Sequence, residues 1–219
     1  MNETMTQEEI QVILTGTFGD GSIQFNKSMT AAKFTASSIH ESYLEFKKSF
    51  LNLEGMYIKG RSSKTCKAGV VYELYCYLSP DVAKIHSKTL KEKLDLLNDF
   101  GIALWFYDDG CKHKSKNAYD LATHAFTKEE HEEIIIPFFN SINLFPSLYS
   151  DKRANKYYLH FPAFKGGLEI GKKLSKYKVD VFDYKQCSEE ILAKWEIYKH
   201  KKIDMNKRCQ YNDLNAITL

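Results

Sequence analysis

Apolar and polar positions in the first half of the chain change period several times, and these changes predict an order of helices and strands. Apolar side chains follow Thr6 at helical spacing, and Glu9 lies three positions later, as in a capping box. The segment "VVYELYCYL" is rich in residues that favour strands. We therefore expect a helix at 7–19, strands at 22–28 and 33–39, a helix at 40–53, strands at 55–60 and 70–78, and a helix from 81 to 88.

The second half repeats this order. Thr127 and Glu130 form another capping box before an apolar run. The order αββαββα, found twice, predicts an α+β fold in which two pseudo-symmetric halves, residues 1–99 and 100–219, each carry an antiparallel sheet. The basic tail from Trp195 onward is expected to form a peripheral helix and a frayed end. We expect a helix at 100–109, strands near 110–114 and 118–125, a helix after Thr127, strands near 144–150 and 156–161, and a helix at 162–175.

Two short segments echo each other at equivalent places in these halves. "ILTGTFGDGSI" and "GIALWFYDDGCK" each run from an apolar helix into an acidic residue, Asp20 or Asp109, and then a glycine. The C-terminal end of a helix carries partial negative charge, so an acid there costs roughly 0.3–1 kcal/mol. One such Asp-Gly pair is an ordinary helix end with a turn. Two pairs predict that the helices lie side by side and bring both carboxylates together, which a divalent cation such as Mg²⁺ would stabilise.

Close approach of these two helices requires small residues at the contact. The first segment offers Thr15, Gly16 and Gly19, whereas the second offers only Ala103 beside bulky neighbours. The contact is therefore expected to be asymmetric. The aromatic residues that follow Ala103 are interpreted as core filling.

Composition and charge restrict the possible partners only loosely. The 219 residues are 43% hydrophobic and carry a formal net charge of +3, which permits a nucleic-acid partner without requiring one. The five cysteines form no CxxC pair and are odd in number, which argues against a disulfide framework and against a zinc site. This cysteine usage favours a reducing compartment, either the cytoplasm or an organelle matrix. The seven histidines show no ligand spacing such as HExxH, so we assign them no metal. The apolar runs are too short to span a membrane.

The two echoed segments resemble the degenerate motifs of single-chain LAGLIDADG homing endonucleases. The second is the sharper match, in the "LAxWFxDDG" form, and "THAFTKEEHEEI" resembles the stretch that follows it in the family. The likeness extends from about residue 7 to residue 188. In the first motif, Gly16 lies one residue closer to the acid than the family's usual glycine, which changes the expected helix register but not the acid.

The resemblance implies a saddle of two four-stranded sheets in the major groove of a long, near-asymmetric DNA site, cleaved by a monomer with Mg²⁺ or Mn²⁺ in intron homing. Carried over by motif, Asp20 and Asp109 are the metal ligands and catalytic acids. Gly19 and Asp108, directly before them, complete the residues expected around the metal. The slot of Asp108 is usually not the metal ligand in the family, and packing or helix-end hydrogen bonding is its alternative role. The family also places a lysine near each active site, and Lys88 and Lys185 fit those places.

The resemblance further implies that alternate residues of the strands contact DNA. Arginine and lysine suit guanine, asparagine and glutamine suit adenine, and several contacts are expected to reach phosphate only. Alternation alone does not decide which set of residues faces DNA. The candidates are Gln24, Asn26, Lys33, Thr35, Ser37, Arg61 and Tyr72 in the first half, and Lys112, Lys114, Tyr119, Thr123, Lys152, Arg153, Lys156 and Tyr158 in the second.

Two other functional hypotheses stay open. The same scaffold could serve as an intron RNA maturase or as a DNA-binding regulator that does not cut, and loss of either acid would favour these. Both Asp20 and Asp109 are present, which favours cleavage. The alternative of an unrelated two-layer α+β enzyme would require the internal echo to be a coincidence.

Overall fold

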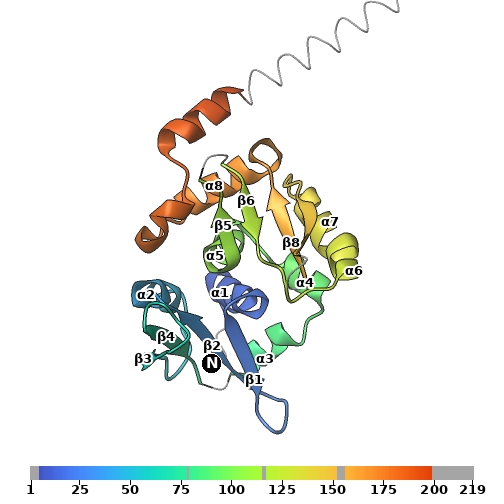
Figure 1. Ribbon diagram of the computed structural model, residues 1–219. Helices are drawn as coiled ribbons and strands as arrows, with labels where there is room; N and C mark the ends of the chain where they lie inside the picture. The colour runs from blue at the N-terminus through green and yellow to red at the C-terminus, as the bar shows by residue number, and fades with distance from the viewer. Residues whose placement is uncertain (1–4, 78, 115–116, 152–155, 199–219) are drawn as a thin grey trace, which may run out of the picture. The chain divides into compact units, whose positions relative to one another are not determined.

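The structure is a computed structural model that describes residues 5–77, 79–114, 117–151 and 156–198. The chain divides into two compact units, residues 1–186 and residues 187–219. The first unit contains both four-stranded sheets (Figure 1). In the described part of the second unit, residues 189–198 are helical. No described helix has the length and apolar character needed to cross a membrane.

The first repeat forms a four-stranded antiparallel sheet with the order β1-β2-β4-β3. Residues on β2 alternate in burial, with Ala32, Phe34 and Ala36 completely buried against the helices. The residues of the opposite face are partly or fully exposed. The elements are α1 (Gln7–Phe18), β1 (Gly21–Phe25), β2 (Ala32–Ser38), α2 (Glu41–Lys48), β3 (Tyr57–Ser62), β4 (Val70–Tyr75), α3 (Pro80–His86) and α4 (Leu90–Asp95).

The second repeat forms an equivalent sheet with the order β5-β6-β8-β7. Tyr119, Leu121, Leu159 and Phe161 are buried on its helix-covered face. The elements are α5 (Asp99–Asp109), β5 (Gly110–Lys112), β6 (Tyr119–Leu121), α6 (Lys128–Glu130), a π-helical turn (His131–Ile135), α7 (Ile136–Ser141), β7 (Ser147–Asp151), β8 (Lys156–Phe161), a 3-10 turn (Ala163–Lys165), α8 (Gly167–Lys176) and a second 3-10 segment (Asp180–Lys185). The predicted α+β class with two repeated halves and antiparallel sheets is confirmed.

Helices α1 and α5 lie next to each other between the two sheets (Figure 1). The side chain of Gln11, completely buried, donates to the carbonyl of Leu96 at 3.0 Å and accepts from the amide of Asn98 at 3.1 Å, so it ties α1 to the start of α5. Further along, the rings of Phe18 and Trp105 are 4.7 Å apart. These contacts fix the alignment of the two helices and hence of their C-terminal ends.

The small residues at this contact differ in part from those predicted. Gly16 faces the sheet rather than α5, because a Cβ at that position would lie 2.4 Å from the ring of Phe34. Gly101 does face α1, where a Cβ would lie 2.1 Å from the side-chain oxygen of Gln11. The sequence analysis also missed α4 and extended α2 by several residues beyond its end at Lys48. The capping boxes at Thr6 and Thr127 are present as predicted.

Candidate active site at the ends of the paired helices

Both central helices end at a glycine that caps the last turn. The amide of Gly19 donates to the carbonyl of Thr15 after α1, and the amide of Gly110 donates to the carbonyl of Phe106 after α5. Neither of these fully described helices has a basic residue in its last turn. The partial negative charge of each helix end therefore lies beside a carboxylate, Asp20 or Asp109, without compensation from the helix itself.

The two helix ends meet closely. A Cβ atom on Gly19 would lie 2.1 Å from Oδ2 of Asp109 and 3.3 Å from Cβ of Asp108, so only glycine leaves room for the second motif. Asp20 follows Gly19 directly in the chain. The structure thus brings the two sequence-predicted acids to one place, together with Gly19 and Asp108.

The carboxyl of Asp109 is the most perturbed acidic group of this cluster. Its Oδ2 atom is buried and has no hydrogen-bond partner among the described residues. Burial, followed by the charges of Asp108 and Asp20, raises the pKa of Asp109 to about 8. Asp20 as a whole residue is more exposed than Asp109. Its carboxyl is still partly shielded from water, which raises its pKa, and the charge of Asp108 raises it further.

Asp108, in contrast, is fully satisfied by two groups from α2. Lys47 donates to both carboxylate oxygens at 2.8 Å, and the hydroxyl of Tyr43 donates to Oδ1 at 2.7 Å. The Lys47 and Asp108 side chains are each only 1% exposed, so this is a buried ion pair. It joins the two repeats, because Lys47 belongs to the first and Asp108 to the second. The carboxylate of Asp108 is therefore committed to a structural contact.

Lys185, predicted as a catalytic residue, lies at the end of α5. Its ammonium group donates to the carbonyl of Tyr107 at 2.6 Å and to that of Phe106 at 3.2 Å. It is buried, which lowers its pKa, while the nearby charges of Asp108, Asp109 and Asp20 act in the opposite direction. Lys185 thus supplies the positive charge that the last turn of α5 lacks.

Lys88, the other predicted lysine, lies between α3 and α4. Its charge acts on Glu92 in the capping box of α4. The lysines whose charges act on Asp20 and Asp109 are Lys47 and Lys185. The first-half lysine at this site is therefore Lys47, which the sequence analysis did not select. Its one signal was a lysine within the apolar face of the helix after residue 40.

A pocket of about 280 Å³ opens beside the carboxylates. Asp20, Asp108 and Lys185 contribute polar groups to its lining, and Tyr43 and Phe182 contribute aromatic surface. The volume is large enough for a small ion with its waters or for part of a phosphate group. Charged groups of both signs thus surround a space that solvent reaches.

These residues fit a divalent metal, for reasons visible in the geometry. Asp109 presents a buried carboxylate oxygen that has no partner among the described residues, and burial with the charges of Asp108 and Asp20 raises its pKa, so a bound cation would favour its ionised form. Asp20 is the second oxygen donor next to it. Hard cations such as Mg²⁺ bind through one or two carboxylates together with water and phosphate oxygens. Asp108 is less suited, because Lys47 and Tyr43 already occupy its oxygens.

Most of the DNA-contact candidates of the first half lie on the exposed sheet face. Gln24 pairs with Lys33 across β1 and β2, and Thr35 and Ser37 continue the same face. Arg61 lies on it too and forms an exposed ion pair with Glu73 at 3.0 Å.

Two first-half candidates are placed differently. Tyr72 lies on the helix-covered face, because it is two positions from the buried Leu74 on the same strand. Its neighbours across the sheet are Ser38 and Gly60. Asn26 is used within the β1–β2 turn, where its side-chain oxygen accepts from the amide of Thr30 at 2.9 Å.

In the second half, register divides the candidates. Tyr158 and Lys156 lie on the exposed face of β8, and Lys114 is exposed after β5. Lys112 shares the inward face with Tyr119 and donates to the carbonyl of Gln186.

The remaining second-half candidates face away from solvent or lie outside the described residues. Tyr119 is buried and donates to the carbonyl of Lys185 at 2.5 Å. Thr123 is buried against His131, with its hydroxyl 2.6 Å from Nε2. Lys152 and Arg153 lie outside the described residues.

Comparison with known proteins agrees with this fold. The profile described as "LAGLIDADG DNA endonuclease family" matches residues 10–165, more than half of the chain. The chain therefore belongs to the LAGLIDADG DNA endonuclease family. Comparison with curated proteins gives no match.

Several solved structures share the architecture. The homing endonuclease I-WcaI, bound to its DNA recognition sequence, is 21% identical with a TM-score of 0.69, covering 84% of this chain and 88% of that one. I-DmoI in complex with DNA and Ca is 14% identical with a TM-score of 0.50, covering 76% and 88%. The N-terminal LAGLIDADG domain of DUF199/WhiA is 12% identical with a TM-score of 0.50, covering 79% and 86%. At these identities the similarity establishes the fold.

Proposed function

We propose that this protein is a sequence-specific DNA endonuclease that hydrolyses phosphodiester bonds of a long, near-asymmetric double-stranded site. It acts as a monomer, with Mg²⁺ or Mn²⁺. The observation that carries the proposal is the buried Oδ2 atom of Asp109, which has no hydrogen-bond partner among the described residues and lies beside the helix end that bears Asp20. An acid kept in this position costs stability, which is understandable if a cation binds it during function.

Asp20 and Asp109 would hold the metal, one from each repeat. When bound, the metal supplies positive charge to the scissile phosphate and acidifies a bound water. Lys47 occupies Asp108, which leaves the other two acids available. Lys47 and Lys185 both lower the pKa values of Asp20 and Asp109, so they favour the ionised carboxylates that metal binding needs. Lys185 reaches the lining of the adjacent pocket, where it can also interact with a phosphate.

The exposed faces of the two sheets are proposed to contact the DNA. In the first sheet this face carries Gln24, Lys33, Thr35, Ser37 and Arg61, which offer donors and acceptors suited to base edges and phosphates. In the second it carries Lys156 and Tyr158. The I-WcaI structure, a relative in fold, is described as bound to its DNA recognition sequence, and that of I-DmoI as a complex with DNA and Ca, which supports both the DNA partner and the divalent cation.

The test is selection of cleaved sites from a randomised or genomic DNA library with Mg²⁺, followed by assays on the recovered site. We expect one long site, and we expect Asp20→Asn and Asp109→Asn each to reduce cleavage at least about a thousandfold, the scale of losing a catalytic group. DNA affinity, measured with Ca²⁺, should change by less than about threefold. Cutting of both strands at the wild-type rate by either variant would refute the metal assignment. Site-specific binding without cutting by the wild type would favour a maturase or a regulator.

A further inference from the structure

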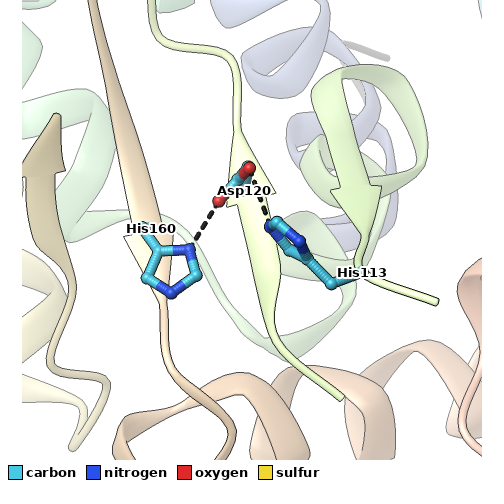
Figure 2. Close-up of side chains that lie close together, drawn as sticks. All are labelled: His113, Asp120 and His160. Carbon is cyan, nitrogen blue, oxygen red and sulfur yellow. Dashed lines mark hydrogen bonds and ion pairs between the residues drawn. The ribbon is translucent and has the colours of Figure 1, made fainter. Parts of the chain in front are cut away.

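A second group of potential metal ligands, which does not include Asp20 or Asp109, lies on the exposed face of the second sheet. His113 directly follows β5, Asp120 is the central residue of β6, and His160 lies in β8 (Figure 2). The register pairs Asp120 with His160 across neighbouring strands. Because Leu121 and Leu159 on these strands point into the core, the three polar side chains share the opposite face.

The three side chains converge on one point. Asp120 lies between the two imidazoles in Figure 2, with Oδ1 2.6 Å from Nδ1 of His160 and Oδ2 2.9 Å from Nε2 of His113. The three ligand atoms all lie within 4.8 Å of one another. The two imidazole rings are 5.4 Å apart and nearly perpendicular, and the ring of Tyr149 packs edge-on against His160 at 5.5 Å. This aromatic packing restricts the orientation of the His160 ring.

We propose that His113, Asp120 and His160 form a binding site for a divalent transition metal of the Zn²⁺ type. Two imidazole nitrogens and one carboxylate oxygen are a donor set typical of Zn²⁺ sites with an open coordination position, whereas Mg²⁺ binds oxygen ligands. The site therefore differs in metal preference from the carboxylate pair at Asp20 and Asp109. It is independent of whether the protein cleaves DNA.

The present distances describe a form in which protons bridge the ligands. Zn–N and Zn–O bonds of about 2.0–2.1 Å at tetrahedral angles place neighbouring donor atoms about 3.3–3.4 Å apart. The observed 2.6 and 2.9 Å are hydrogen-bond lengths, so binding requires a small outward movement of at least one ligand. His113 is the side chain most able to move, since it is 40% exposed compared with 23% for His160. The metal displaces the bridging protons, so its affinity should rise with pH.

The experiment is isothermal titration of the full chain with Zn²⁺ in excess Mg²⁺, which saturates carboxylate-only sites. We expect one Zn²⁺ per chain with micromolar or tighter affinity. His113→Ala, Asp120→Asn and His160→Ala should each weaken Zn²⁺ affinity at least about tenfold. Removal of a residue that hydrogen-bonds to a metal ligand already weakens metal affinity by about tenfold or more, and removal of the ligand itself should weaken it at least as much. His124→Ala, at an exposed histidine outside the group, is the matched control and should bind as the wild type does.

A thiol-based site is the main rival, because Cys111 is exposed and pairs with Asp120 in the register. We expect Cys111→Ser to retain Zn²⁺ binding, and Co²⁺ to give visible d–d bands without a thiolate charge-transfer band. The Co²⁺ spectrum of the wild type keeps the proposal testable even if a ligand variant folds poorly. The proposal is overturned if the wild type binds no stoichiometric Zn²⁺, if the His113→Ala/His160→Ala double variant retains it, or if Cys111→Ser abolishes it.

Discussion

The C-terminal ends of α1 and α5 come from equivalent places in the two repeats, yet their surroundings differ strongly. The α1 end carries one acid, Asp20, which is more exposed than Asp109, although the groups around its carboxyl still raise its pKa. The α5 end carries Asp108 and Asp109 in a buried environment, and both lysines of the site, Lys47 and Lys185, bind to this end. Repetition of sequence therefore produces a site that is symmetric in its two acids but asymmetric in its cations.

The adjacent residues Asp108 and Asp109 show what this asymmetry achieves. Asp108 has a buried lysine and a tyrosine hydroxyl as partners, whereas Oδ2 of Asp109 has no partner among the described residues. One carboxylate is thus neutralised within the protein, and the other is left with a pKa of about 8. The first stabilises the contact between repeats, and the second is available for an external cation.

The largest effect on stability is expected from breaking the Lys47–Asp108 pair. Lys47→Met leaves a buried carboxylate without its cation, so the free energy of unfolding should fall by about 3–5 kcal/mol. Chemical denaturation measures this loss. The double variant Lys47→Met/Asp108→Asn should recover part of it, because the unpaired charge is gone. A loss below about 1 kcal/mol in the single variant would show that the pair is not buried in solution.

Removal of Lys185 should have a smaller effect. Lys185→Met leaves the carbonyls of Phe106 and Tyr107 without their donor, at a cost of about 1–3 kcal/mol. It also removes a charge that favours ionised Asp109, so the Mg²⁺ concentration needed for half-maximal cleavage should rise. Denaturation and cleavage at varied Mg²⁺ test the two parts. An unchanged Mg²⁺ requirement would contradict the proposed coupling.

The pH dependence of the metal-free protein should reveal Asp109. Its pKa is raised from 3.8 to about 8, so the folded state binds a proton that the unfolded state has lost. Stability should therefore fall as pH rises from about 4 to about 8 and then level off. Asp109→Asn should remove this slope and melt at a higher temperature than the wild type at pH 9, and Mg²⁺ should stabilise only the wild type. A steeper slope in the variant would contradict this interpretation.

The smallest effect is expected at Lys88. It lies between α3 and α4, and the charges acting on the paired acids come from other lysines. Lys88→Ala should change the cleavage rate by less than about threefold. Lys88→Ala and Lys185→Met, assayed side by side, compare the two sequence-predicted lysines directly. A hundredfold loss in Lys88→Ala would restore the original prediction of a catalytic lysine there.

Local patterns predicted most of the helices and strands, though not α4 or the end of α2, and they located the two acids. Capping boxes, alternation and the internal echo are properties of neighbouring residues, and they gave the order of both repeats. Sheet register was not available in the same way. Lys112 and Tyr119 alternate like surface residues, yet their strands pair so that both face inward.

The contacts that sequence analysis missed join residues far apart in the chain. Lys47 lies in the first repeat and Asp108 in the second, and the residues around Lys47 in the sequence do not indicate which carboxylate it pairs with. His113, Asp120 and His160 come from three segments, so no ligand spacing could reveal them. Such groups depend on how the strands pair, which local propensity does not determine.

The Lys47–Asp108 contact also has a consequence for protein engineering. Anyone who recombines the first repeat of this chain with the second repeat of a relative will transplant one partner of a buried charge pair without the other. Such a chimera needs a compatible residue at both positions, or neutral replacements at both. The residues at positions 47 and 108 thus help to determine whether repeats of different origin can be combined in one stable chain.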